Sequence, residues 1–195
     1  MKTKRILCLI SLLLALTFFV PCHGWTQSLF RYEGGTQVKP GTHAPIIANT
    51  FAVEKGYYGY IWKIYIEAED PDGDMLRIAT VVDQLGYGHY PPDWIYLKPA
   101  NQKHFKGYIQ WNTFSSRAGY LREWTEINLK VSVFDKAGNE SNEIVLPFTF
   151  ESGVSGQHET KLPAPFDQGD LIKLGNIRID LFEPTMDDGH NVRDD

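Results

Sequence analysis

Residues 60–69 read Tyr-Ile-Trp-Lys-Ile-Tyr-Ile-Glu-Ala-Glu and carry the clearest secondary-structure signal in the chain. From Trp62 to Ala68 every second residue is apolar, and the residues between them are Lys, Tyr and Glu. Side chains along a β-strand point alternately to its two faces, so this pattern predicts a strand with one buried and one wetter face.

Six further runs of β-prone residues surround this strand and are separated by clusters of Gly, Pro, Asp and Asn. The seven predicted strands are residues 46–53, 60–69, 76–82, 94–97, 108–112, 127–133 and 144–150. No helical pattern of useful length competes with them. We therefore expect an all-β fold over residues 44–151, a seven-stranded, immunoglobulin-like antiparallel β-sandwich. A jelly roll or a small barrel is the alternative.

Residues 1–24 have the pattern of a secretory signal peptide. A basic start precedes the almost continuously apolar residues 6–20, and the small residue Gly24 stands before Trp25. We expect cleavage before Trp25 and export to the periplasm or the medium, without a stable membrane span afterwards, because the apolar run is too short for one. A lipoprotein anchored at Cys22 and a retained anchor helix are the alternatives.

The composition of the mature chain excludes several classes of function. Both cysteines, Cys8 and Cys22, precede Trp25, so disulfide scaffolds and cysteine-ligated metal sites are excluded. After removal of the signal peptide 16 basic residues remain against 24 acidic ones, a net charge of −8 that disfavours nucleic acid and anionic membranes as partners. The histidines are scattered and no catalytic motif is present, so we expect no enzymatic activity.

Two segments of loop composition flank the predicted sandwich. Residues 25–43 are polar, lack a sustained period and are interpreted as a leader arm. Residues 152–195 form an extended tail with nine acidic and four basic residues. We therefore expect one sandwich domain between a leader arm and an acidic tail.

One stretch of the tail, residues 176–183, alternates like a strand, with Ile177, Ile179 and Leu181 on one side. A lone strand is not stable in water. We expect these three side chains to anchor the tail, either at an edge of the chain's own sheet or on a partner. A tail that stays disordered in the isolated protein is the third possibility.

In a sandwich of this kind, successive loops alternate between its two ends. One end would then gather residues 69–74 and 135–139, which are rich in Asp. The other end would gather residues 57–60 and 86–94, which are rich in Tyr and also contain a Trp. The sequence thus predicts an acidic pole and an aromatic pole.

The acidic pole is a candidate calcium site. Asp70, Asp72 and Asp74 alternate around a glycine turn, and Asp135 comes from the neighbouring loop. Ca²⁺ takes six to eight oxygen ligands, so we expect these four carboxylates to bind it weakly and to tie the two loops together. The alternative is ordinary turn chemistry, in which Pro71 fixes φ and the Asp side chains bind nearby main-chain amides.

The aromatic pole is a candidate carbohydrate site. Tyr58, Tyr87, Tyr90 and Trp94 could offer flat apolar ring faces together with hydrogen-bonding OH and NH groups. The alternative is that these rings cap the core or pack beneath their own loops.

Three short motifs are similar to those of a known family. They are Asp-Pro-Asp-Gly-Asp-Met-Leu at residues 70–76, Gly-Tyr-Ile-Gln-Trp at 107–111 and Val-Ser-Val-Phe-Asp-Lys-Ala-Gly-Asn at 131–139. They resemble the cadherin-like, dystroglycan-type immunoglobulin-fold modules of bacterial secreted and surface proteins. The resemblance implies a seven-stranded sandwich, export, Ca²⁺ at the Asp-rich turn, and a role in adhesion, as a spacer or as a carbohydrate-facing module.

From these patterns we expect an exported, non-enzymatic binding or structural module that contacts an envelope or extracellular protein. A carbohydrate-binding module whose partner is a polysaccharide is the alternative. Pulldown on insoluble polysaccharides distinguishes the two.

Overall fold

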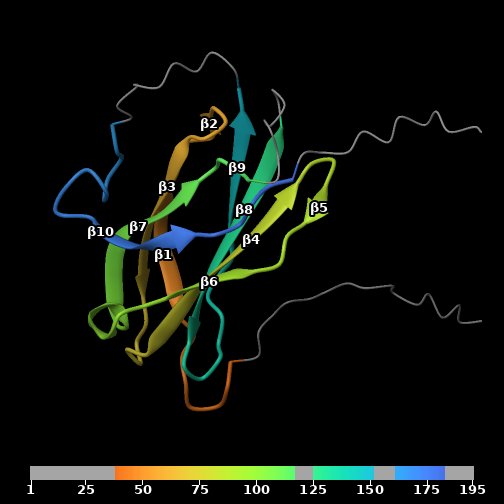
Figure 1. Ribbon diagram of the computed structural model, residues 1–195. Helices are drawn as coiled ribbons and strands as arrows, with labels where there is room; N and C mark the ends of the chain where they lie inside the picture. Colours follow the sequence, from red (N-terminus) through yellow and green to blue (C-terminus); the bar gives the residue numbers. More distant parts are fainter. Residues whose placement is uncertain (1–37, 117–124, 152–160, 183–195) are drawn as a thin grey trace, which may run out of the picture. The chain divides into compact units, whose positions relative to one another are not determined.

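The computed structural model describes residues 38–116, 125–151 and 161–182, all of which belong to one compact unit (Figure 1). These residues form ten β-strands and one short 3-10 helix, Pro99–Asn101, and contain no α-helix. The strands are β1 (Ile46–Phe51), β2 (Lys55–Gly56), β3 (Ile61–Glu69), β4 (Met75–Gln84), β5 (Gly88–His89), β6 (Asp93–Tyr96), β7 (His104–Asn112), β8 (Glu126–Asp135), β9 (Ile144–Phe150) and β10 (Ile172–Ile177). Nowhere in the described ranges is there a helix with the length and hydrophobicity that crossing a membrane requires.

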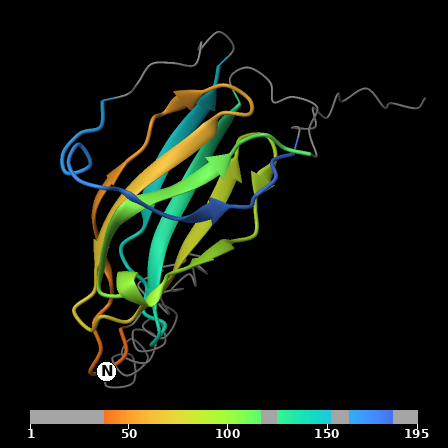
Figure 2. The same ribbon diagram turned by 60° about the vertical axis from the view of Figure 1, so that its left-hand side comes forward.

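The strands form two sheets that face each other as in a sandwich (Figure 2). One sheet has the order β1-β3-β7-β10, and the other has the order β2-β9-β8-β4-β5, with β6 also paired to β4. The pairs are antiparallel except for β10 on β7 and β2 on β9, which are parallel. The prediction of an all-β, sandwich-like fold is therefore confirmed.

The core lies between the two sheets and contains the alternating residues of β3. Trp62, Ile64 and Ile66 are fully buried. The ring centroid of Trp62 lies 4.5 Å from that of Phe148 on β9, so aromatic rings of the two sheets are in contact. Burying a large apolar side chain contributes roughly 1.5–3 kcal/mol, so this row of residues is a main source of the attraction between the sheets.

Each of the seven predicted strands overlaps an observed strand, but the count of seven is not confirmed, because the described residues form ten. β2 and β5 are ladders of two residues, which leave no periodic pattern in a sequence. The tail strand, predicted at residues 176–183, is found as β10, Ile172–Ile177. It ends at Ile177, and beyond that residue side chains from the body of the sandwich bind the main chain in place of a sheet ladder.

Some of the sequence-based predictions lie outside the described residues. These are the signal peptide, the leader arm up to residue 37, and residues 152–160 and 183–195 of the tail. The last part of the leader arm, residues 38–43, is described, and the main-chain N–H of Lys39 donates to Oδ1 of Asn139 at 2.9 Å. The end of the arm therefore packs against the loop between β8 and β9.

The edge strand β1 is held by a side chain from the other sheet's connecting loop. The main-chain N–H of Ile47 donates to Oδ1 of Asn142 at 2.8 Å, and Nδ2 of Asn142 donates to the carbonyl oxygen of Ile47 at 3.1 Å. The pairing of β1 with β3 also shifts register between Ile47 and Asn49. A side-chain amide thus occupies both main-chain groups of Ile47.

Candidate functional site

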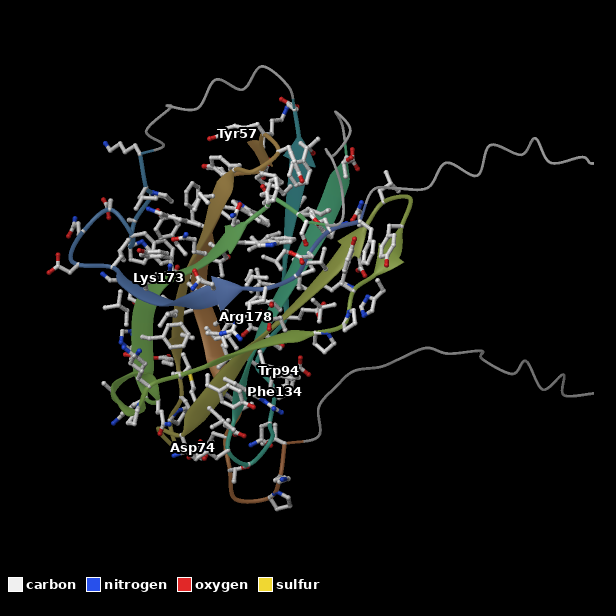
Figure 3. The ribbon with its side chains drawn as sticks, viewed as in Figure 1. Tyr57, Asp74, Trp94, Phe134, Lys173 and Arg178 are labelled. Carbon is white, nitrogen blue, oxygen red and sulfur yellow. The ribbon has the colours of Figure 1, made fainter. Side chains whose placement is uncertain are left out.

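The loops before β4, before β7 and after β8 meet at one end of the sandwich, where Figure 3 labels Asp74. The main-chain N–H of Asp70 donates to the carbonyl oxygen of Lys103 at 2.9 Å, and that of Lys136 donates to the carbonyl oxygen of Asp74 at 3.1 Å. These loops form the acidic pole.

Two of the four predicted calcium ligands are buried and bind the main chain of their own turns. The carboxylate of Asp70 accepts hydrogen bonds from the N–H groups of Asp72 (3.0 Å) and Asp74 (3.1 Å). The carboxylate of Asp135 accepts hydrogen bonds from the main-chain N–H (2.7 Å) and the side-chain amide (2.6 Å) of Asn139. Both are 1–2% exposed and stabilise the conformation of their loops.

The third ligand, Asp72, binds the leader arm. Its carboxylate accepts a hydrogen bond from the main-chain N–H of His43 at 2.7 Å and lies 2.8 Å from Nδ1 of the same residue. The hydrogen bond to Asp72, together with its negative charge, raises the pKa of His43, and the same contact lowers the pKa of Asp72. Both groups are open to solvent, so the pair is a modest electrostatic link between the arm and the pole.

The fourth ligand, Asp74, has a carboxylate oxygen, Oδ1, that is buried and has no hydrogen-bond partner in the described chain. Loss of solvent raises the pKa of Asp74, and the neighbouring Asp70 and Asp135 raise it further. Among the described residues no group of three or more His, Cys, Asp or Glu side chains is arranged to hold a metal ion. Calcium binding stays a prediction, and the contacts of Asp70 and Asp135 are those of ordinary turn chemistry.

The three predicted tail anchors lie in the core. Ile177, Ile179 and Leu181 are all buried and belong to the same cluster as the β3 side chains. The tail therefore packs on its own chain and runs parallel to β7 over Ile172–Ile177.

Past β10, side chains bind the main chain of the tail. The indole Nε1 of Trp111 donates to the carbonyl oxygen of Ile179 at 3.0 Å. Four further bonds are Arg178 N–H to Asp93 Oδ2 (2.9 Å), Ser115 Oγ to Leu181 O, Gln84 Nε2 to Phe182 O (2.8 Å) and Phe182 N–H to Tyr90 Oη (2.7 Å). Residues 178–182 are thus held by side chains from both sheets, from the loop after β7 and from the segment between β5 and β6.

Of the four predicted carbohydrate-binding rings, those of Tyr87 and Trp94 lie at different points along the six-stranded sheet. The hydroxyl of Tyr58 donates to the carbonyl oxygen of Ser115 at 2.9 Å, whereas Tyr87 and Tyr90 stack on each other with ring centroids 4.9 Å apart. Trp94 pairs with Ala79 on β4, whereas Gly88, the neighbour of Tyr87, pairs with Gln84 on the same strand. These two β4 residues are five positions apart, which is about 16 Å along the strand. The rings therefore do not form one platform.

An open groove of about 570 Å³ lies beside Tyr87. Its lining includes Asp83, Leu85, Tyr87, His89, Glu126 and Asn128. The carboxylate of Asp83 lies 2.8 Å from Lys130 Nζ and 2.6 Å from His89 Nδ1. The hydrogen bond from Lys130 is the main cause that lowers the pKa of Asp83, and the bond from His89 is the second. Tyr87 is 44% exposed, so the groove combines an accessible ring with fixed polar groups.

A second cluster, on the outer face of the six-stranded sheet, was not predicted from the sequence. The guanidinium carbon of Arg77 lies 3.9 Å from the ring centroid of Trp94 and 5.7 Å from that of Phe134, and these two rings meet edge to face at 5.4 Å (Figure 3). Nε of Arg77 is buried without a hydrogen-bond partner, and no ion pair within the described ranges involves this residue. Tyr96, which pairs with Arg77, is 63% exposed.

The arginine–aromatic cluster depends on strand register, which the sequence does not reveal. Its members come from three strands, since β4 carries Arg77, β6 carries Trp94 and Tyr96, and β8 carries Phe134. The one local signal is a cation beside the apolar residues at the start of the predicted strand 76–82.

No protein-family model and no curated protein sequence matches this chain.

Proposed function

We propose that this protein is an exported, non-enzymatic binding module that contacts a protein partner at the cell envelope through the outer face of its six-stranded sheet. The observation that carries the proposal is the side chain of Arg77, stacked on Trp94 and close to the ring of Phe134, without an acidic partner in the described chain. Arginine and large aromatic residues dominate the energetics of protein interfaces.

The exposure of neighbouring residues supports the same face. Tyr96, which pairs with Arg77 across β4 and β6, is 63% exposed, so an exposed ring lies beside the cluster. An approaching protein thus meets the exposed ring of Tyr96 beside the partly buried stack of Arg77 and Trp94.

The finer fold assignment, an immunoglobulin-like sandwich, belongs to this proposal. The strands β1, β3 and β7 share one sheet, and β9, β8, β4 and β6 follow one another in the second. Immunoglobulin-type sandwiches divide their strands in this way, with a fourth strand beside the third of the first sheet. Here β10 takes that place, which favours a variant of the fold completed by the tail.

Site-specific photocrosslinking in the cells that make the protein tests the binding face. A photoreactive residue at position 96 is expected to give a discrete protein adduct, and the adduct should disappear when Arg77→Ala is added. The matched control is a photoreactive residue at Ile172, which is 40% exposed on the other sheet. An adduct at position 96 that survives Arg77→Ala, or equal adducts at both positions, contradicts the proposal.

Export is tested by the intact mass of the protein recovered outside the cytoplasm. A mass beginning at Trp25 supports signal-peptide cleavage. A diacylglyceryl mass on Cys22 would instead make the protein a membrane-anchored lipoprotein.

A carbohydrate-binding function is the second candidate, and the groove beside Tyr87 favours it. Sugar sites commonly pair an exposed ring with carboxylate and amide hydrogen bonds. Pulldown on insoluble polysaccharides should then depend on Tyr87, whereas Tyr57→Ala, at another partly exposed tyrosine, should leave it unchanged. Retention of the Tyr87→Ala variant on the same polysaccharide would exclude the groove as the site.

A further inference from the structure

The tail lies in a groove that recognises its main chain through side chains. We define the tail groove by Trp111, Ser115, Gln84, Tyr90 and Asp93, which make the five bonds to residues 178–182 given above. All five lie before residue 151, in the body of the sandwich. The body of the sandwich therefore supplies a hydrogen-bonding group for five main-chain groups of residues 178–182.

The tail groove also selects the side chains of its occupant. Ile177, Ile179 and Leu181 enter the core at alternate positions, and the ring of Phe182 stacks on Tyr87 at 4.9 Å, with an angle of 10° between the ring planes. The matching ligand is an extended peptide with apolar residues at every second position and an aromatic residue after the last of them.

Two glycines make the approach of the tail strand close. A Cβ on Gly107 of β7 would lie 2.3 Å from the carbonyl oxygen of Ile172, and a Cβ on Gly175 of β10 would lie 2.4 Å from Cγ2 of Ile95. Both distances are far shorter than van der Waals contact. The groove and the tail strand are thus complementary at the level of the main chain.

The contacts that the tail makes before β10 would be the same if the tail belonged to a second copy of the chain. Before β10, Nζ of Lys106 donates to the carbonyl oxygens of Pro165 (3.3 Å) and Gln168 (3.2 Å), and Phe166 packs on Tyr65. The body ends at residue 151 and the described part of the tail begins at residue 161, so nine residues join them. Nine extended residues span up to about 30 Å, which gives the tail a long connection at its N-terminal end.

We infer that the tail groove is a peptide-binding site that also accepts residues 161–182 of a second copy of this chain, giving a dimer with exchanged tails. The contacts inside the groove are the same in the monomer and in the dimer, so only the connecting residues differ. The dimer fraction then rises with protein concentration. The monomer prevails as long as the effective concentration of a chain's own tail at the groove exceeds the concentration of other chains.

Single-cysteine variants of the full chain test the exchange, in a background with Cys8→Ser and Cys22→Ser. Gln110 on β7 and Asn176 on β10 are paired in register, at a separation that a disulfide can bridge. A ¹⁵N-labelled Gln110→Cys protein is mixed with an unlabelled Asn176→Cys protein at a series of concentrations and then mildly oxidised. We expect the mixed disulfide dimer to exceed both symmetric dimers at least tenfold and to increase with concentration and incubation time.

Two controls make the result decisive. The pair Lys130→Cys and Val145→Cys lies on β8 and β9, outside the tail, and should give mixed dimers only at the statistical level. At the lowest protein concentration the double variant Gln110→Cys/Asn176→Cys should close within one chain, which verifies the register. A mixed dimer at the statistical level for Gln110→Cys with Asn176→Cys, or a double variant that fails to close, overturns the inference.

Discussion

The indole N–H of Trp111 donates a hydrogen bond of 3.0 Å to the carbonyl oxygen of Ile179, 68 residues further along the chain. Both residues are buried. This bond joins a central strand of the four-stranded sheet to the tail at a place where the tail has left the sheet ladder. The tail is therefore a structural part of the sandwich, and its attachment can be measured one bond at a time.

Trp111→Phe removes the indole donor and keeps an aromatic ring in the core. The carbonyl of Ile179 is then buried without a partner, which costs about 1–3 kcal/mol of unfolding free energy. Urea unfolding measures this loss, and amide exchange over residues 176–182 should become faster. Trp94→Phe, on the outer face, is the control, and equal tail exchange in both variants would show that the indole does not hold the tail.

Gly175→Ala is expected to destabilise the protein by roughly 1–3 kcal/mol, because the added methyl group overlaps Cγ2 of Ile95. Ile95→Ala removes that carbon at its own cost, as a cavity in the core. The double variant should lose less stability than the two single variants added together, because Ile95→Ala removes the atom that the new methyl group would overlap. Denaturant titration of all four proteins gives the coupling free energy, and strictly additive losses would mean that Ile95 does not limit the approach of β10.

Asp72→Asn should lower the pKa of His43 toward its ordinary value of 6.5, because the hydrogen bond and charge of Asp72 raise it. The raised His43 pKa stabilises the folded state below 6.5, and this contribution is lost as the pH rises through the folded value. The lowered pKa of Asp72 stabilises the folded state above pH 3.8, and this stabilisation is lost as the pH falls through the folded-state pKa. NMR titration of His43 is the measurement. Glu67→Gln, near His104, should leave the His43 titration unchanged, and an unshifted His43 in Asp72→Asn would mean that the contact is not populated in solution.

Asp74→Asn should raise the melting temperature at pH 7. The pKa of Asp74 is raised by burial and by its acidic neighbours, so the folded state holds this proton more tightly than the unfolded chain. For such a group stability is highest below the ordinary value of 3.8 and falls as the pH rises through the folded value. The gain from Asp74→Asn should shrink toward pH 4. A lower melting temperature across the whole pH range would contradict this account.

Calcium binding at the acidic pole has its own measurement. Extracellular modules bind Ca²⁺ with dissociation constants of roughly 10⁻⁴ to 10⁻³ M, and ten times that concentration adds about 1.4 kcal/mol of stability. We expect the melting temperature in millimolar Ca²⁺ to exceed that in chelator by a few degrees, and Asp72→Asn to abolish the difference. Asp167→Asn in the tail is the control. Equal shifts in the wild type and Asp72→Asn, or no shift in either, would leave the Asp-rich turn as a turn only.

The sequence predicted those parts of the molecule that a local pattern determines. The alternation around Trp62 gave a strand and its buried face, because side-chain direction along a strand depends only on position. The apolar residues Ile177, Ile179 and Leu181 were identified for the same reason, yet the strand bounds were wrong. The side chains that bind the tail's main chain come from distant strands, and no local pattern records them.

The surface features required knowledge of register. Trp94 looked like a partner of Tyr87, because both stand in one aromatic stretch of sequence, but pairing with β4 places them at different points along the sheet. The same pairing brings Trp94 to Arg77, which is 17 residues away. Strand register is set by long-range packing, so a single sequence does not predict which side chains meet on a sheet face.

The two hydrogen bonds between Asn142 and Ile47 hinder the pairing of edge strand β1 with another copy of the chain. An exposed edge strand offers unpaired N–H and C=O groups to any other extended chain, and fibrils grow by such edge-to-edge addition. On β1 the amide of Asn142 has already taken the donor and the acceptor of Ile47, and the register shift that follows breaks the flat row an incoming strand would need. An incoming strand would therefore find neither the N–H nor the C=O group of Ile47 free to pair.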